Sequence, residues 1–296
     1  MKCFYHNDAD GKCAAFWVHN TQKARDEHEP YFQVVDYGRP FPHDMVKPGE
    51  QVWIVDFSLE TADMEELIQK CGIENIYWID HHKTAIDKYE GFPHDLQGVR
   101  DIEKAACELT FQFTQWWSRP EDDERTFEEF CITLETPLFT QLIADRDIWK
   151  WEFGKSTKHF YAGSQLLDTR PFSKDWERLL NEPNFCEQIK ENGKLVEQFR
   201  ARQRRIDISY FGYEVEFEGH QCMAINGPAS GDLGQNVRSQ GYEIAIIYRR
   251  DKAGQWTVSL YSDSVDVGEI ARAFGGGGHK GAAGFKTDED PNSLWL

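Results

Sequence analysis

The sequence is poor in basic residues. Its 33 Lys and Arg residues stand against 51 Asp and Glu residues, which gives a formal net charge of -18. A surface of that charge repels phosphate polymers, so the composition argues against broad binding of long duplex nucleic acid. It does not exclude a phosphorylated ligand, because divalent metals held by carboxylates reverse the potential locally.

C-x-x-C cysteine pairs and long apolar runs are absent as well. The seven cysteines are odd in number, scattered and never spaced as C-x-x-C, which is typical of reduced thiols and predicts a cytoplasmic protein. His6, Asp8 and Asp10 interrupt the first apolar stretch, so we expect no signal peptide. No run approaches the ~20 apolar residues of a membrane span, and we expect no membrane partner.

The chain has enough apolar residues to fold. Its 296 residues correspond to about two domains at roughly 150 residues per domain. A composition of 40% hydrophobic and 14% aromatic residues is too apolar for a disordered chain. We therefore expect a globular protein whose domains each bury a core.

Short apolar runs alternate with helical periodicity in the first half of the chain. The runs cover residues 2–5, 51–55 and 76–79, and the helical segments cover 12–19 and 62–71. This pattern predicts an α/β fold with a mostly parallel, buried sheet and flanking helices. Ligands of such open sheets bind beyond the carboxyl ends of the strands, where His6, Asp56 and Asp80 are expected.

The remaining segments predict helices that cover the sheet, a connector and a second domain. Helical periodicity covers 103–117, 126–143 and 187–205, β-type runs cover 213–218, 221–225, 242–249 and 255–262, and a last helix covers 267–274. We expect a catalytic domain at 1–160, a helical connector at 161–208 and a smaller α/β domain at 209–296. A cleft between the two domains would hold the ligand.

Candidate metal ligands stand at several predicted strand or helix ends. They are His6, Asp8 and Asp10 in H-x-D-x-D, Asp56, the Asp80-His81-His82 run, and Asp145. Any one of them is explained by helix capping or a turn, but capping does not explain why all of them reach one edge. Carboxylate and imidazole ligands together suit two manganese ions, with magnesium as the alternative.

Three separate motifs resemble one family. The residues HNDADG at 6–11, DHH at 80–82 and GGGGHKGAAG at 275–284 resemble the DHH/DHHA1 phosphoesterases, and the opening motif is most similar to the nanoRNase-type oligoribonucleases. The resemblance implies a DHH domain followed by a DHHA1 domain. It also implies hydrolysis of short oligonucleotides by a hydroxide that two metal ions activate.

The resemblance implies a role for each motif residue. His6 and Asp8 would hold one metal, Asp10, His81 and Asp145 the other, and Asp56 would bridge both. Asp80 would orient the ligands, and His82 would contact the scissile phosphate or protonate the leaving oxygen. Asp147 is the second candidate for the position given to Asp145. The C-terminal motif would bind the terminal phosphate or nucleotide of the substrate through Gly276, Gly277, Gly278, His279 and Lys280.

Several alternatives stay open at this point. A cyclic mono- or dinucleotide phosphodiesterase or a 3',5'-bisphosphate nucleotide phosphatase would use the same metal ligands. A non-catalytic nucleotide- or RNA-binding module is the alternative from another class, although it has no need of a full ligand set. In glycine runs a helix C-cap is the common explanation. The oligomeric state is open, with a homodimer among the options.

Overall fold

The structure is a computed structural model and describes residues 1–23 and 30–295. The chain divides into two compact units, Met1–Glu197 and Gln198–Leu296. Helix α9 (Phe185–Phe211) is 27 residues long and contains the division. In these described ranges no helix is both long and apolar enough to cross a membrane.

The first unit contains a four-stranded sheet in the order β2-β1-β3-β4, and all its strand pairs are parallel. Its elements are β1 (Lys2–His6), α1 (Ala9–Lys23), β2 (Tyr31–Val35), β3 (Val52–Val55), α2 (Thr61–Cys71), β4 (Ile76–Ile79), α3 (Lys83–Lys88), α4 (Ala106–Trp117), α5 (Phe127–Ile132), α6 (Leu138–Asp147), α7 (Lys155–Ser164) and α8 (Lys174–Asn181). The predicted parallel sheet is confirmed. Strand β2 was not predicted, and it lies at an edge of the sheet, where it is less buried than the other strands.

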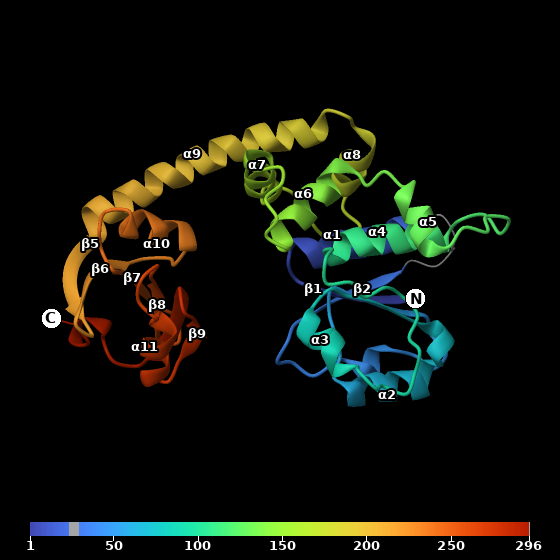
Figure 1. Ribbon diagram of the computed structural model, residues 1–296, viewed down its shortest axis with the longest axis horizontal. Helices are drawn as coiled ribbons and strands as arrows, with labels where there is room; N and C mark the ends of the chain where they lie inside the picture. Colours follow the sequence, from blue (N-terminus) through green and yellow to red (C-terminus); the bar gives the residue numbers. More distant parts are fainter. Residues whose placement is uncertain (24–29, 296) are drawn as a thin grey trace. The chain divides into compact units, whose positions relative to one another are not determined.

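The strands of this sheet are buried on both faces. Alternate residues point to opposite sides, so Trp53 and Val55 pack in one apolar cluster while Val52 and Ile54 pack in the other. Helices α1 and α4 lie together on one side of the sheet and α2 lies on the other (Figure 1). Because both faces of the sheet are covered, the sequences of its central strands are continuous apolar runs and do not alternate between apolar and polar residues.

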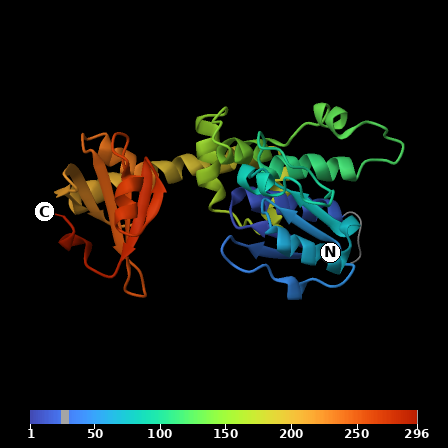
Figure 2. The ribbon, with the colours of Figure 1, turned by 60° about the horizontal axis from the view of Figure 1, so that its bottom comes forward.

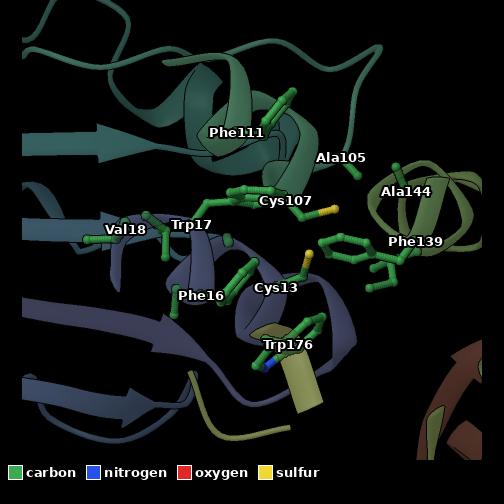
Figure 3. Packing of buried hydrophobic residues seen from close by; sticks show 14 of the residues in the cluster. Cys13, Phe16, Trp17, Val18, Ala105, Cys107, Phe111, Phe139, Ala144 and Trp176 are labelled. Atoms are coloured by element: carbon green, nitrogen blue, oxygen red, sulfur yellow. The ribbon is translucent and has the colours of Figure 1, made fainter. Parts of the chain in front are cut away.

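Aromatic side chains fill the larger core. Trp17 of α1 packs on Phe111 of α4 with ring centroids 4.5 Å apart, and Phe16 stacks on Trp176 of α8 at 5.3 Å (Figure 3). Burial of each such side chain contributes roughly 1.5–3 kcal/mol. The compact unit thus reaches beyond residue 160, the domain boundary expected from the sequence, because α8 and the start of α9 belong to this core.

The second unit contains a six-stranded mixed sheet in the order β5-β6-β7-β8-β10-β9. Its elements after α9 are β5 (Gly212–Phe217), β6 (His220–Asn226), α10 (Gly231–Arg238), β7 (Ile244–Arg250), β8 (Trp256–Tyr261), α11 (Val267–Ala273), β9 (Gly277–His279) and β10 (Ala282–Thr287). Figure 2 shows these strands side by side. Only β6 and β7 pair in parallel, and α10 is in the crossover that a parallel pair requires.

Candidate metal centre

Neighbouring strands of the first sheet deliver polar side chains to one edge. His6 ends β1, Asp56 directly follows β3 and Asp80 directly follows β4. The register pairs Tyr5 with Val55 and Val55 with Ile79, so the residues that follow these positions are adjacent. The predicted convergence of these three segments is therefore what the sheet produces.

The HNDADG segment is folded tightly around His6. His6 Nδ1 lies 2.6 Å from Asp8 Oδ2, and Asp8 Oδ1 accepts a hydrogen bond from the Gly11 N–H at 2.9 Å. A Cβ on Gly11 would lie 2.3 Å from the His6 carbonyl oxygen and 3.0 Å from Asp56 Oδ2. Gly11 lies inside α1, so the close approach of these groups, and not a sharp turn, requires glycine there.

Asp10 has two structural partners as well as a place at the site. It is 1% exposed, and its two carboxylate oxygens each accept a backbone N–H at 2.8 Å, from Ala106 and Cys107 at the start of α4. A carboxylate at a helix N-terminus is favoured by the exposed N–H groups and the helix dipole. Asp10 Oδ2 is also 3.6 Å from His81 Nε2, so one side chain caps a distant helix and faces the cluster.

Asp56 lies between two groups of ligands. Its Oδ2 is 3.7 Å from His6 Nδ1, and its Oδ1 is 3.4 Å from His81 Nε2. The residue is 1% exposed, and its Oδ2 accepts no hydrogen bond from the part of the chain that the structure describes. Its backbone has φ +55°, a left-handed conformation that Asp tolerates better than most residues. A buried carboxylate oxygen without a donor is costly unless a cation is bound to it.

The Asp80-His81-His82 run is held by Asp80. Its Oδ1 accepts hydrogen bonds from the His81 N–H at 2.7 Å and lies 2.7 Å from His82 Nδ1, and its Oδ2 accepts from the Ser58 hydroxyl. Burial raises the pKa of Asp80, but the hydrogen bonds from His82 and Ser58 outweigh it and hold that pKa below its usual value. Asp80 is thus an ionised group that orients both histidines.

The ADRD segment at 144–147 offers two aspartates, and the structure separates them. Asp147 Oδ2 lies 3.3 Å from His81 Nε2. Asp145 points elsewhere, because its carboxylate accepts hydrogen bonds from the N–H groups of Glu152 and Phe153 and from the Thr157 hydroxyl. Asp145, which the sequence reading preferred, is therefore outside the cluster and closes the loop before α7, while Asp147 is inside it.

The cluster contains three overlapping groups of possible metal ligands. They are His6, Asp8 and Asp56; Asp56, His81 and His82; and Asp10, His81 and Asp147, and the ligand atoms of each group lie within 4.8 Å of one another. Asp56 and His81 each belong to two groups. Shared ligands between two adjacent sites are the arrangement that a pair of divalent ions needs, and mixed carboxylate and imidazole donors fit manganese.

Burial and mutual repulsion raise the pKa values of three carboxylates in the cluster. Burial, followed by the charge of Asp56, raises the pKa of Asp10 to about 7, and burial with the charge of Asp10 raises that of Asp147 to about 7. Burial also raises the pKa of Asp56 well above its usual value. Without bound cations, ionisation of one of these acids makes ionisation of the others less favourable. Bound divalent ions would offset that repulsion.

Two residues of the site were not predicted from the sequence. Ser58 is buried and donates to Asp80. Tyr37 follows β2, is 53% exposed, and its ring centroid lies 5.8 Å from that of His6 and 6.2 Å from that of His82. The unpredicted strand β2 carries Tyr37 to this edge, so an assignment of 31–35 as a strand would have found it.

The C-terminal glycine motif forms the end of α11 and a hairpin. Gly275 has φ +77° and ends α11, so it is the helix-cap glycine. A Cβ on Gly276 would lie 2.2 Å from the Gly284 carbonyl oxygen, whereas a Cβ on Gly277 would meet nothing within 4 Å. His279 and the following Lys280 are exposed. The motif thus combines glycines that the hairpin needs with one that it does not.

Comparison with known proteins finds a domain family that matches the C-terminal part of the chain and a relative that matches almost all of it. The DHHA1 domain family matches residues 199–294. Oligoribonuclease NrnB from Bacillus subtilis is 25% identical over 310 residues, which cover 99% of this chain and 74% of NrnB. Residues 199–294 thus match the DHHA1 domain family, and the chain as a whole resembles the DHH/DHHA1 phosphoesterases. The resemblance stated from its three motifs is confirmed.

Further proteins are similar to this chain in sequence or in fold. Uncharacterized protein R106 of Acanthamoeba polyphaga mimivirus is 26% identical over 80% of this chain and 53% of its own length, so the chain spans about half of R106. The solved PF0399 DHH domain superposes with a TM-score of 0.53 at 16% identity and covers 99% of this chain and 84% of its own. Exonuclease RecJ bound to manganese superposes at 0.51 with 14% identity and covers 99% and 86%. These two likenesses show the fold.

Proposed function

We propose that this protein is a metal-dependent phosphodiesterase that hydrolyses short oligonucleotides. The observation that carries the proposal is the buried carboxylate of Asp56, which lies between His6 and His81. Its backbone is left-handed, and one of its oxygens accepts no hydrogen bond from the described residues. In this proposal His6 and Asp8 hold one divalent ion, Asp10, His81 and Asp147 hold a second, and Asp56 is shared. Asp147 takes the position that the sequence reading gave to Asp145.

Bound divalent ions would supply positive charge against the phosphate oxygens and lower the pKa of the attacking water. His82 is placed to manage the remaining proton. Its hydrogen bond with Asp80 raises the pKa of His82 to about 9, so it is protonated at neutral pH. A protonated imidazole that is 37% exposed along its side chain can donate to the phosphate or to the departing oxygen.

The C-terminal unit binds the end of the substrate in this proposal. Gly277, His279 and Lys280 leave an accessible backbone and two donors at the edge of its sheet, which suit a phosphate. The family relative NrnB is named an oligoribonuclease, and that name supports short RNA as the substrate. The seven cysteines are free thiols, which supports a reducing, cytoplasmic compartment.

The test is a panel of substrates with and without Mn²⁺. It contains RNA of two to five nucleotides, RNA of ~20 nucleotides, cyclic mono- and dinucleotides and adenosine 3',5'-bisphosphate. We expect the shortest linear RNAs to be hydrolysed fastest and chelation of the metal to abolish turnover. Faster hydrolysis of a cyclic dinucleotide or of the bisphosphate would reassign the substrate. No turnover of any compound by folded protein with bound Mn²⁺ would reject the enzyme and favour a binding module.

A further inference from the structure

A pocket of about 510 Å³ opens beside the candidate metal centre, within the first unit. Asp8, Asp10 and Asp147 of the cluster are among its lining residues, so the pocket adjoins the cluster. Its volume lies inside the ~300–1,000 Å³ range of small-molecule sites. The sequence did not single out this pocket.

The rest of the lining suits a nucleotide. Lys12 of α1 and Arg146 of α6 bring positive charge, Ser164 and Thr169 bring hydroxyl groups, and the partly exposed Ala9 and Leu167 bring apolar surface. Cations and hydroxyls bind phosphate and sugar oxygens, and the apolar groups accept the flat face of a base. The pocket therefore offers each kind of contact that one nucleotide needs.

Both cations are half-buried although the chain is strongly acidic. Among the residues that the structure describes, neither Lys12 nor Arg146 forms an ion pair with a carboxylate. The Arg146 guanidinium instead lies 3.4 Å from the centroid of the Tyr161 ring. Stacking of this kind orients the guanidinium while its N–H donors stay free for an anion. Half-buried positive charge without an acidic partner suits a site where a ligand brings the negative charge.

We propose that this pocket binds the nucleotide next to the scissile phosphate, and that Arg146 and Lys12 hold the phosphate of that nucleotide. The inference rests on the proposed phosphodiesterase function and adds where the substrate is recognised. A substrate then needs a second phosphate one nucleotide away from the cleaved bond, which in a dinucleotide is the terminal phosphate. Tyr161 is a positioning residue, since it acts by holding Arg146.

The experiment compares a substrate that has the second phosphate with one that lacks it. An RNA trinucleotide has it, and bis(p-nitrophenyl) phosphate is a phosphodiester without it. The variants are Arg146→Gln and Lys12→Gln, each measured for KM and kcat on both compounds with Mn²⁺. Arg119→Gln is the matched control, because Arg119 also stacks on an aromatic ring, 4.2 Å from the centroid of Trp116, but does not line the pocket.

We expect KM for the trinucleotide to rise about tenfold or more in both variants, with kcat changed less than about threefold, because a charge-assisted contact to phosphate is lost. Hydrolysis of bis(p-nitrophenyl) phosphate should stay within about twofold of wild type. An unchanged KM for the trinucleotide would overturn the inference. So would equal damage to both substrates in the two variants, because Arg146 and Lys12 would then support the metal centre itself.

If the wild-type protein hydrolyses neither compound, the proposed function fails and the pocket is tested by binding. Calorimetry with Mn²⁺ then compares adenosine 3',5'-bisphosphate, which has two phosphates on one ribose, with AMP. Tighter binding of the bisphosphate that Arg146→Gln and Lys12→Gln abolish and Arg119→Gln retains would support the pocket. Equal preference in wild type and variants would overturn it.

Discussion

The metal edge of the first unit and the glycine hairpin of the second unit reach unusual backbone conformations in different ways. In the first unit, positive φ angles occur at Asp56 of the metal edge and at Trp149 and Trp151 in the loop after α6, which all have large or charged side chains. In the glycine hairpin they belong to Gly275 and Gly278. A glycine adopts this conformation without strain, whereas a side chain there must be held by its surroundings.

The two regions also differ in burial and charge. Asp10, Asp56 and Asp80 are almost fully buried, and they share the two histidines: His81 lies near Asp10 and Asp56, and His82 lies near Asp56 and Asp80. His279 and Lys280 are exposed. Buried, interacting charges depend on every neighbour, while exposed donors on a hairpin depend on local chain geometry. Changes at the metal edge should therefore affect chemistry and protonation together, and changes at the hairpin should affect either folding or binding.

The largest expected effect is that of Asp56→Asn. It should lower kcat by about 10³-fold or more, beyond the ~10–100-fold loss typical of a residue that only supports a metal ligand. Metal-free stability should be unchanged or higher, because the amide has no buried charge to accommodate. Circular dichroism and Mn²⁺-dependent turnover check this. Asp44→Asn, an exposed change in the same unit, is the control, and near-normal turnover of Asp56→Asn would reject the shared-ligand assignment.

The metal-free protein should become less stable as pH rises. Asp10 and Asp147 have pKa values raised to about 7, so the folded state binds protons that the unfolded state has released above pH ~4. The pKa values of His6, raised to about 10 by Asp56 and Asp8, and of His82, raised to about 9 by Asp80, act in the same direction. The stabilising contribution of the two histidines is complete below pH ~6.5, and that of the two aspartates is complete below pH ~4. Each contribution is lost as pH rises through the pKa of that group in the folded state.

Mn²⁺ should reverse this loss, because it replaces the protons on the cluster. At about 100 times its Kd it adds about 2.7 kcal/mol of stability, and the rise in Tm should be larger at pH 8.5 than at pH 5.5. Thermal unfolding with and without Mn²⁺ measures both trends. A metal-free Tm that increases from pH 6 to pH 8 would contradict the described coupling of the carboxylates.

Gly276→Ala should destabilise the second unit by about 1–3 kcal/mol, the usual penalty of overpacking. The new Cβ would lie 2.2 Å from the Gly284 carbonyl oxygen and 2.6 Å from Phe285 Cβ. Gly277→Ala is the matched control, because a Cβ there has open space and stability should change by less than about 0.5 kcal/mol. Urea unfolding distinguishes the two, and equal losses would show that the hairpin geometry is not the cause.

His279→Ala should raise KM for a short RNA about tenfold, which corresponds to 1.4 kcal/mol, and change kcat much less. His279 is exposed on β9, so the fold does not depend on it. Steady-state kinetics of His279→Ala and Gly277→Ala, measured in parallel, check whether the hairpin binds substrate. A collapse of kcat at constant KM would mean that His279 takes part in the chemistry.

The smallest effect is expected at Trp149, which has φ +58° and is 73% exposed. Trp149→Asn should stabilise the first unit by up to about 1 kcal/mol, because Asn tolerates the left-handed conformation and little packing is lost. Chemical unfolding measures the change. A loss of stability larger than about 1 kcal/mol would show that the contact of Trp149 with the Trp151 ring, 5.8 Å between centroids, outweighs the strain.

Much of the fold was predictable because its signals are local. The apolar runs that became β1, β3 and β4 are short, continuous and followed by a polar residue, which is typical of buried parallel strands. The edge strand β2 was missed, since it is only partly buried. The hairpin of β9 and β10 was not predicted, because glycines carry no periodicity that marks a strand.

The residue types at the metal edge follow from local signals, because strand ends and the H-x-D-x-D and DHH spacings place them without long-range information. The choice between Asp145 and Asp147 depends on packing between distant segments. Two positions apart on a helix correspond to about 200° of rotation, so only one of them can face His81, and the bonds of Asp145 to the loop before α7 leave that place to Asp147. The same holds for Asp10, whose cap on α4 joins residues 96 positions apart, because contacts across that distance exist only once the chain has packed.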